Sequence, residues 1–208
     1  MDRNLLARAA SAVRDTMIAN KDYLTFLDQQ NGDGDLGISM VQGYTVIARY
    51  LESVEEQDLG RLFMNCASVF NDAAPSTLGT ITSFFLMGMA RALKGKREAS
   101  LEDMVAACEA GLAHMMEKAG SKPGEKTIVD SLEPAVRALR AHLGEGTSKA
   151  LAEAAKAAAE GSEATRTMKP VHGRAAYYGD KCVGLLDGGS VAGKLVFESL
   201  ANFAVSGQ

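Results

Sequence analysis

The spacing of apolar side chains constrains the fold of this 208-residue chain more than any other feature. Apolar residues recur at three- and four-residue steps along most of the chain, as the buried stripe of an α-helix requires. No stretch shows the sustained two-residue alternation of a half-buried strand. Helices are therefore expected over residues 5–27, 38–51, 58–70, 80–93, 100–116, 127–143, 147–159 and 190–205. Asp58 is expected to cap the third helix, and Ser100 with Asp103 to form the capping box of the fifth.

Short connections that contain glycine join these predicted helices, which favours antiparallel neighbours. We therefore expect an all-α fold, an antiparallel up-and-down barrel or bundle of about eight helices with its ligand site at one end. The sequence has no repeat of solenoid period and no linker long enough to divide it. Residues 1–208 are accordingly expected to form a single domain.

Glycines gather at four of the helix junctions. They are Gly32, Gly34 and Gly37, then Gly79, then Gly120 and Gly124, and finally Gly173, Gly179, Gly184, Gly188 and Gly189. Alternate loops of an up-and-down bundle lie at the same end, so these loops can converge. Helix amino termini that are approached through glycine offer backbone N–H groups to anions. The pattern therefore predicts a phosphate-binding end of the bundle.

Charge and composition argue against several other functions. A net charge of −4 without a basic cluster indicates that neither nucleic acid nor an anionic membrane surface is a partner. No apolar stretch is long enough to span a bilayer, and the first residues lack the apolar core of a signal peptide. The cysteines Cys66, Cys108 and Cys182 are widely spaced and form no CxxC pair. They are expected to be free thiols, which is typical of a cytoplasmic protein.

Three aspartates, Asp28, Asp33 and Asp35, fall within eight residues in the segment LDQQNGDGDLG. Folding alone explains this cluster poorly, because neighbouring carboxylates repel unless a cation neutralises them. Oxygen ligands of this kind suit Mg²⁺ or Ca²⁺. An EF-hand is excluded by register, since its loop would need glycine where Leu36 stands and glutamate where Gln42 stands. A solvated Asp-Gly turn with a helix cap remains the alternative to a metal site.

The same segment, extended to LDQQNGDGDLGISM, resembles the signature of the nucleotide-binding L subunit of dihydroxyacetone kinases. Two further stretches agree in the same order. PGEKTIVD (123–130) is similar to the family's PGDKT segment, and HGRAAYYGDKCVGLLDGG (172–189) to its GRASYLGERSxGxxDPG stretch. The resemblance covers essentially the whole chain. It implies an eight-helix antiparallel barrel that binds ADP or ATP with Mg²⁺ at one end.

The resemblance also implies a role for individual residues. The metal ligands would be Asp28, Asp33 and Asp35. The phosphate contacts would be Leu36, Gly37, Ile38 and Ser39, together with the loop residues Ser76, Thr77, Gly79 and Thr80. The adenosine side of the site would be Gly120, Ile128, Arg174, Asp187, Gly188 and Gly189. Hydroxyl and N–H groups in these stretches can donate to phosphate oxygens, and Arg174 would supply a cationic or stacking contact.

The chain departs from the family pattern close to the phosphates. Leu36 and Ser39 stand where the family usually has histidine and asparagine, which leaves only the Ser39 hydroxyl as a polar side chain there. The family's GGxSGPLFGT loop is the shorter AAPSTLGT, and its DPGA turn is DGGS. The aspartates are retained while their surroundings change.

The resemblance implies a phosphotransferase, the L subunit of a dihydroxyacetone-kinase-like system. It would transfer a phosphoryl group to dihydroxyacetone or a related small ketose held on a separate K subunit. Either ATP exchanges freely, or bound ADP is recharged by an M subunit of a phosphotransferase system, and self-association stays open. The altered residues 36–39 motivate an alternative, a catalytically inactive nucleotide-binding regulatory protein. A stand-alone Mg-dependent phosphatase or nucleotide hydrolase is the third hypothesis.

Overall fold

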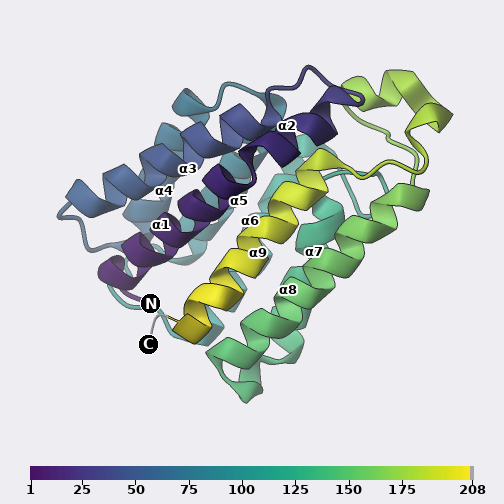
Figure 1. Cartoon of the computed structure of the whole chain (residues 1–208). Coiled ribbons are helices and arrows are strands. Elements are labelled where there is room, and N and C mark those ends of the chain that lie inside the picture. Colours follow the sequence, from purple (N-terminus) through teal and green to yellow (C-terminus); the bar gives the residue numbers. More distant parts are fainter. Residues whose placement is uncertain (207–208) are drawn as a thin grey trace.

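The computed structural model describes residues 1–206, and every regular element in this part of the chain is helical (Figure 1). The α-helices are α1 (Arg3–Ala19), α2 (Lys21–Gln29), α3 (Leu36–Ser53), α4 (Leu59–Ala73), α5 (Thr77–Ala92), α6 (Leu101–Ala119), α7 (Val129–Ala141), α8 (Thr147–Ala164) and α9 (Gly188–Ser206). Three 3-10 segments accompany them, η1 (Leu143–Glu145), η2 (Thr165–Thr167) and η3 (Arg174–Cys182). Among these elements, no helix has both the length and the apolar character that a membrane span needs.

The helices form a closed ring. The helix α1 packs against α3, each helix from α3 to α9 packs against the next along the chain, and α9 packs back against α1. The short α2 follows α1 and packs on α3, so α1 and α2 together make one of eight members of the ring. Neighbouring members run antiparallel (Figure 1). The predicted all-α antiparallel barrel of about eight helices is confirmed.

Asn20 divides the first predicted helix, residues 5–27, into two. Its backbone leaves the helical conformation (φ −107°, ψ 10°), and its side-chain amide donates to the carbonyl oxygen of Thr16 at 2.8 Å. Asparagine competes in this way with the backbone's own hydrogen bonds and ends a helix. The prediction of a single helix was therefore wrong at this point. The predicted cap at Asp58 and the capping box of Ser100 with Asp103 are both confirmed.

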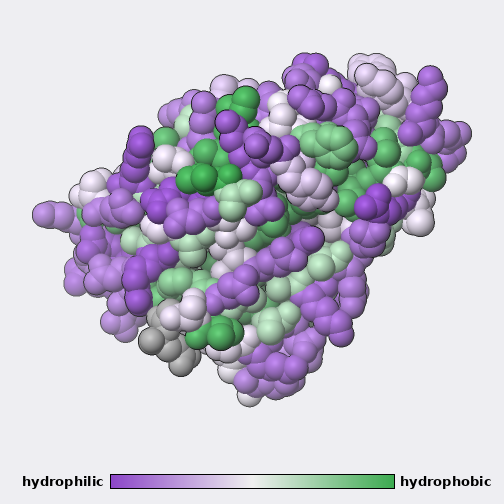
Figure 2. All heavy atoms as spheres, in the orientation of Figure 1, coloured by the Kyte–Doolittle hydropathy of each residue, from purple (hydrophilic) through white to green (hydrophobic). Residues whose placement is uncertain are grey.

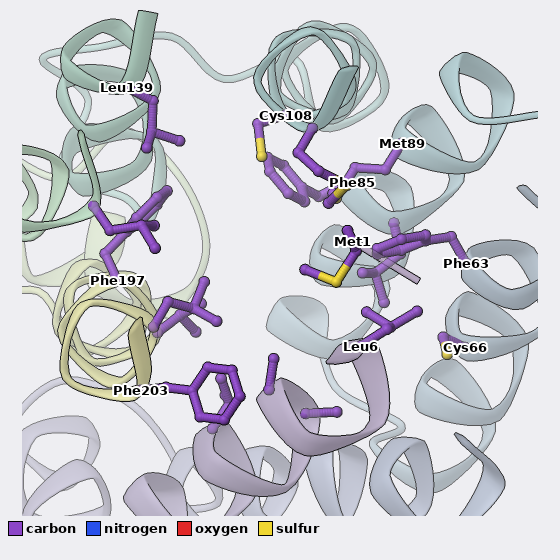
Figure 3. Close-up of a pocket in the computed structure, with 18 of the residues that line it drawn as sticks. Met1, Leu6, Phe63, Cys66, Phe85, Met89, Cys108, Leu139, Phe197 and Phe203 are labelled. Atoms are coloured by element: carbon purple, nitrogen blue, oxygen red, sulfur yellow. The ribbon is translucent and has the colours of Figure 1, made fainter. Parts of the chain in front are cut away.

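The inside of the barrel is apolar. Phe70 is fully buried, and its ring meets the ring of Tyr44 edge to face at a centroid distance of 5.1 Å. A cavity of about 450 Å³ remains between the helices. Figure 3 shows the side chains of Leu6, Phe63 and Phe85 around it. The core that holds the helices together therefore occupies the barrel axis and leaves the ends for loops.

Four connections share one end of the barrel because the helices alternate in direction. These are the α2/α3, α4/α5, α6/α7 and α8/α9 connections, and the four glycine clusters of the sequence lie in them and in the first turns of the helices that follow. We call this end the site end. The α8/α9 connection is the longest of the four and includes η2 and η3, which extend beyond the helices at the right of Figure 1.

Candidate functional site

The three predicted metal ligands lie together at the site end, where α2 finishes and α3 begins. One carboxylate oxygen from each of Asp28, Asp33 and Asp35 lies within 4.8 Å of the other two. Asp28 belongs to the last turn of α2 and is half-buried, whereas Asp33 and Asp35 are exposed. The carboxylates thus form one cluster that solvent can reach.

Asp28 organises the loop that carries the other two aspartates. Its Oδ2 atom accepts hydrogen bonds from the backbone N–H groups of Gly34 (2.8 Å), Asp35 (3.0 Å) and Leu36 (3.3 Å). A carboxylate that accepts several backbone N–H groups stabilises a tight turn. One oxygen of Asp28 therefore shapes the turn, and its other oxygen, Oδ1, is left for a ligand.

Asp33 and Asp35 are not needed to close this turn. Asp35 occupies the N-cap position of α3, yet its side chain makes no capping hydrogen bond. Burial raises the pKa of the Asp35 carboxyl, the charges of Asp33 and Asp28 raise this pKa further, and Arg174 opposes the rise. A bound cation would relieve that repulsion. A turn with a helix cap therefore accounts for Asp28 but not for the carboxylates of Asp33 and Asp35.

The donor set fits a hard divalent cation. Mg²⁺ binds oxygen at about 2.1 Å, so two oxygens of one ion lie at most about 4.2 Å apart. The three carboxylate oxygens already lie within 4.8 Å of one another, on side chains of which two are exposed. Small side-chain rotations would bring them to the spacing that the ion requires.

Glycine is required at three positions in and next to this loop, either by the backbone conformation or by nearby atoms. Gly34 has a φ of +78°, a backbone conformation that favours glycine. A Cβ atom at Gly32 would overlap Oδ1 of Asp28, and a Cβ atom at Gly37 would overlap the carbonyl oxygen of Lys21. The turn can therefore be this tight only because these side chains are absent.

Residues 36–39 form the first turn of α3. Leu36, Gly37 and Ser39 are buried, and Ile38 is 45% exposed. The Leu36 side chain belongs to the core, and a Cβ atom on Gly188 would lie 2.6 Å from its Cδ2 atom. Within residues 1–206, the N–H groups of Gly37 and Ile38 have no hydrogen-bond partner. These two groups at a helix amino terminus are suited to bind an anion.

The predicted phosphate residues of the α4/α5 connection lie at the same end but are engaged locally. Ser76 caps α5, because its Oγ atom accepts a hydrogen bond from Gly79 N at 3.1 Å. The Thr80 hydroxyl donates to Oδ1 of Asn71 at 3.2 Å, and Thr77 begins the helix. The helix starts three residues before the predicted Thr80 because Ser76 provides the cap. In the described part of the chain, no hydrogen bond joins these residues to the carboxylate cluster.

The residues predicted to form the adenosine side lie where the α6/α7 and α8/α9 connections approach each other. Gly120 ends α6 in a left-handed conformation, and a Cβ atom on Gly189 would lie 3.4 Å from the backbone nitrogen of Ile128. Asp187 caps α9 by accepting from Ser190 N at 2.6 Å. Burial raises the pKa of the Asp187 carboxyl to about 7. Ile128 and Gly189 are thus in near contact although 61 positions separate their residue numbers.

Arg174 lies closer to the acidic cluster than its predicted place on the adenosine side suggests. Its Nη2 atom is 2.7 Å from Oδ2 of Asp33, and both side chains are largely exposed. An exposed ion pair of this kind contributes roughly 0–1 kcal/mol to stability. The Arg174 guanidinium can therefore exchange this contact for one with a ligand at little cost.

Two contacts of the α6/α7 connection were missed by the reasoning from sequence. Lys126 is buried and donates to carbonyl oxygens of the α8/α9 connection, and Glu125 pairs with His172 at 2.7 Å. The hydrogen bond from His172 is the main reason why the pKa of Glu125 is lowered. A lysine between Gly124 and an apolar helix start was the available signal, but lysine at such a place is usually exposed.

The barrel and the site together define an all-helical domain whose carboxylate cluster and free helix N–H groups share one end. Comparison with known proteins identifies the family. Residues 30–202 match the DAK2 domain, and the chain belongs to the DAK2 domain family. The resemblance seen in the sequence is thereby confirmed.

Several characterised proteins are similar to this chain. The ADP-binding subunit DhaL of the PEP-dependent dihydroxyacetone kinase of Escherichia coli (strain K12) is 28% identical over 189 residues, which cover 90% of both chains. The corresponding subunit of kinase 1 of Listeria innocua is 30% identical over 187 residues, or 90% of this chain and 89% of the relative. The L-erythrulose kinase of Pectobacterium atrosepticum is 29% identical over 94% of this chain, which spans only 34% of that longer protein.

A solved structure also has this fold. The crystal structure of the dihydroxyacetone kinase from C. freundii in complex with AMP-PNP and Mg²⁺ matches with a TM-score of 0.78 and 27% identity. The match covers 96% of this chain and 34% of that chain. The structure of its native form matches equally well. The barrel therefore corresponds to about a third of that kinase.

Proposed function

We propose that this chain is the nucleotide-binding subunit of a dihydroxyacetone-kinase-like phosphotransferase. It would bind ADP or ATP with Mg²⁺ and pass a phosphoryl group to dihydroxyacetone or a related small ketose. The observation that carries the proposal is the carboxylate cluster, in which Asp33 and Asp35 do not close the turn, beside the free N–H groups of α3. The similarity to ADP-binding subunits over 90% of the chain supports it.

Each part of the site would have one task. Asp28, Asp33 and Asp35 would hold Mg²⁺, which neutralises charge on the phosphates during phosphoryl transfer. The N–H groups of Gly37 and Ile38 would bind phosphate oxygens. The hydroxyl groups and N–H groups of the α4/α5 connection would do the same from the facing side of the site end. The residues where the α6/α7 connection meets the α8/α9 connection would contact the adenosine.

The ketose would be held by a separate K-type subunit. That subunit would dock at the exposed site end, where the phosphate would lie. Large apolar side chains are exposed there, including Phe26 (59%), Val171 (55%) and Tyr177 (92%). Figure 2 shows apolar surface among hydrophilic residues at this end of the molecule. Exposed apolar groups around a charged site are suited to a protein partner. Such a complex would work in the cytoplasm, with ATP or an M subunit as the source of phosphate.

The direct experiment combines this chain with a K-type subunit, Mg²⁺, ATP and a small ketose, and measures the ketose phosphate formed. A parallel reaction replaces ATP with phosphoenolpyruvate and the general and M components of a phosphotransferase system. Product in either reaction supports the proposal, and the reaction that gives it identifies the donor. Tight ADP binding without transfer to any ketose would favour the regulatory alternative instead. Rapid ATP hydrolysis by the chain alone would favour the hydrolase.

A further inference from the structure

Lys126 is a buried cation outside the proposed ligand set. Only 4% of its surface is exposed, and its backbone has a φ of +60°, a left-handed conformation that lysine rarely adopts. Burial lowers the pKa of its ammonium group, and the nearby Asp187 opposes this effect. A buried ammonium persists in a fold only where polar partners compensate for the loss of water.

The polar partners of Lys126 are two carbonyl oxygens, one at each end of a single segment of the chain. The Lys126 ammonium donates to the carbonyl oxygen of Thr165 at 2.5 Å and to that of Leu185 at 2.6 Å. Residues 165–185 make up nearly the whole α8/α9 connection, and we call this segment the arm. A single side chain of the α6/α7 connection therefore holds both ends of the arm together.

Further hydrogen bonds close the base of the arm. Arg166 and Gly184 exchange two of them, from Gly184 N to Arg166 O at 2.7 Å and from Arg166 Nη1 to Gly184 O at 2.9 Å. The fully buried Thr165 accepts from Asp187 N at 3.1 Å through its hydroxyl oxygen. Hydrogen bonds thus close the base of the arm, whereas much of its outer part is exposed.

The arm connects the two halves of the proposed site. Arg174, on the arm, pairs with Asp33 of the carboxylate cluster. Ile128, two residues after Lys126, nearly touches Gly189, which follows the arm. The position of the arm relative to the α6/α7 connection therefore sets both the place of Arg174 and the gap on the adenosine side.

We propose that Lys126 is a positioning residue that holds the arm, and with it Arg174, over the nucleotide site. This inference rests on the proposed function for its effect on ADP, but the placement of the arm can be measured without any ligand. The proposed metal ligands stand on α2 and on the loop between α2 and α3, and this loop is held by its own hydrogen bonds to Asp28. Loss of the Lys126 ammonium should therefore weaken ADP binding without weakening binding of the metal alone, since release of Arg174 from Asp33 removes a competing cation.

The test compares Lys126→Met, which keeps most of the side-chain volume without the charge, with Lys181→Met. Lys181 is exposed on the arm and has no ion pair in the described part of the chain, so it is a matched control. Calorimetry would measure the affinity for ADP in the presence of Mg²⁺ and the affinity for Mn²⁺ alone. We expect Lys126→Met to bind ADP about 10- to 100-fold more weakly, as is typical when a supporting contact of a ligand site is lost. Its affinity for Mn²⁺ should equal or exceed that of wild type, and Lys181→Met should match the wild type in both.

Hydrogen exchange gives a second readout that needs no ligand. In Lys126→Met, amides of the arm should exchange at least about tenfold faster while those of α4 and α5 keep their wild-type rates. Lys126→Gln, which retains N–H donors, should restore part of the protection. Unchanged ADP affinity together with unchanged exchange of the arm would overturn the inference.

ADP binding by the wild-type chain distinguishes a failure of the proposed function from a failure of the inference about Lys126. If it binds no ADP, the proposed function fails, and the exchange of the arm still decides whether Lys126 positions it. If both Lys126 variants fail to fold, exchange of the wild type in increasing urea decides instead. The arm and residues 120–128 should then open together, and separate opening of the two would contradict the role of Lys126.

Discussion

Replacing Gly32 by alanine perturbs the carboxylate cluster without removing a proposed ligand. A Cβ atom at this position would overlap Oδ1 of Asp28, the oxygen that the turn leaves free, and would also lie 2.8 Å from the Asp28 Cγ atom. Gly32 has no left-handed φ, so alanine can adopt its backbone conformation, although the Cβ atom would also lie 2.9 Å from the carbonyl oxygen of Asp28. The Asp28 carboxylate must therefore move away by about 1 Å, a displacement that can cost about 100-fold at a functional site.

We expect Gly32→Ala to bind ADP with Mg²⁺ about 10- to 100-fold more weakly, which corresponds to about 1.4–2.8 kcal/mol. The global fold should survive, because the loop lies outside the barrel core. Isothermal titration measures the affinity, and circular dichroism with thermal unfolding checks the fold.

The matched control is Gly144→Ala at the opposite end of the barrel. A Cβ atom there meets nothing within 4 Å, and the backbone is not left-handed, so binding should be unchanged. An affinity of folded Gly32→Ala within twofold of wild type would refute the reasoning, because Asp28 Oδ1 would then not be needed where the structure places it.

Three further predictions concern the fold and its ionisable groups. Gly43→Ala should destabilise the protein by about 1–3 kcal/mol, because the added Cβ would lie 2.5 Å from the buried ring of Phe70; a thermal midpoint equal to that of wild type would count against this packing. The pKa of Asp187 is raised from 3.8 to about 7, so the ligand-free native state binds a proton that the unfolded state has lost, and stability should fall as the pH rises from about 4 to 7. Urea unfolding across this range checks it, and Asp187→Asn, which keeps an acceptor for the helix cap, should flatten the dependence. Loss of contact with water raises the pKa of Cys66 and of Cys108 to about 12. Both thiols should therefore react with iodoacetamide at pH 8 about a thousandfold more slowly in the native protein than in urea, and equal rates would contradict the raised pKa values.

Helix positions could be predicted from the sequence because they depend on local chemistry. The repeat of apolar residues identified the helical segments, and the side chains of Asp58 and Ser100 with Asp103 marked two helix starts correctly. The break at Asn20 was missed because a single polar residue in an otherwise continuous apolar pattern gives a weak signal. Closure of the ring by α9 against α1 is a long-range contact, and the apolar spacing implies it only through the need to bury every helix.

The same difference between local and long-range contacts decides which parts of the candidate site could be predicted. Asp28, Asp33 and Asp35 are close in sequence, so their clustering needed only a turn. The ion pair of Asp33 with Arg174 joins residues 141 positions apart, and a local sequence pattern cannot predict such a contact. The family resemblance placed Arg174 on the adenosine side, whereas its guanidinium lies at the carboxylates. The buried contacts of Lys126 could not be predicted, because they go to backbone carbonyl oxygens, which every residue carries.

The substitution of leucine for the family's histidine has a structural explanation. Leu36 lies in the core and packs against the backbone of Gly188, where a more polar side chain would lose its contact with water. The first turn of α3 therefore presents its N–H groups and the exposed Ile38 to the site, in place of an imidazole. This change would affect the surroundings of the proposed phosphate and would leave the carboxylate cluster as it is.

The central claim is that the carboxylates of Asp33 and Asp35 serve a metal–nucleotide complex and are not needed for the helical fold. The most direct test is calorimetric titration of ADP with Mg²⁺ into Asp33→Ala and Asp35→Ala, with Asp22→Ala, an exposed aspartate at the start of α2, as the control. We predict that binding is lost in the first two variants and retained in the third, while all three keep the helical content of the wild type. Nucleotide affinity that is unchanged in both Asp33→Ala and Asp35→Ala would contradict the claim.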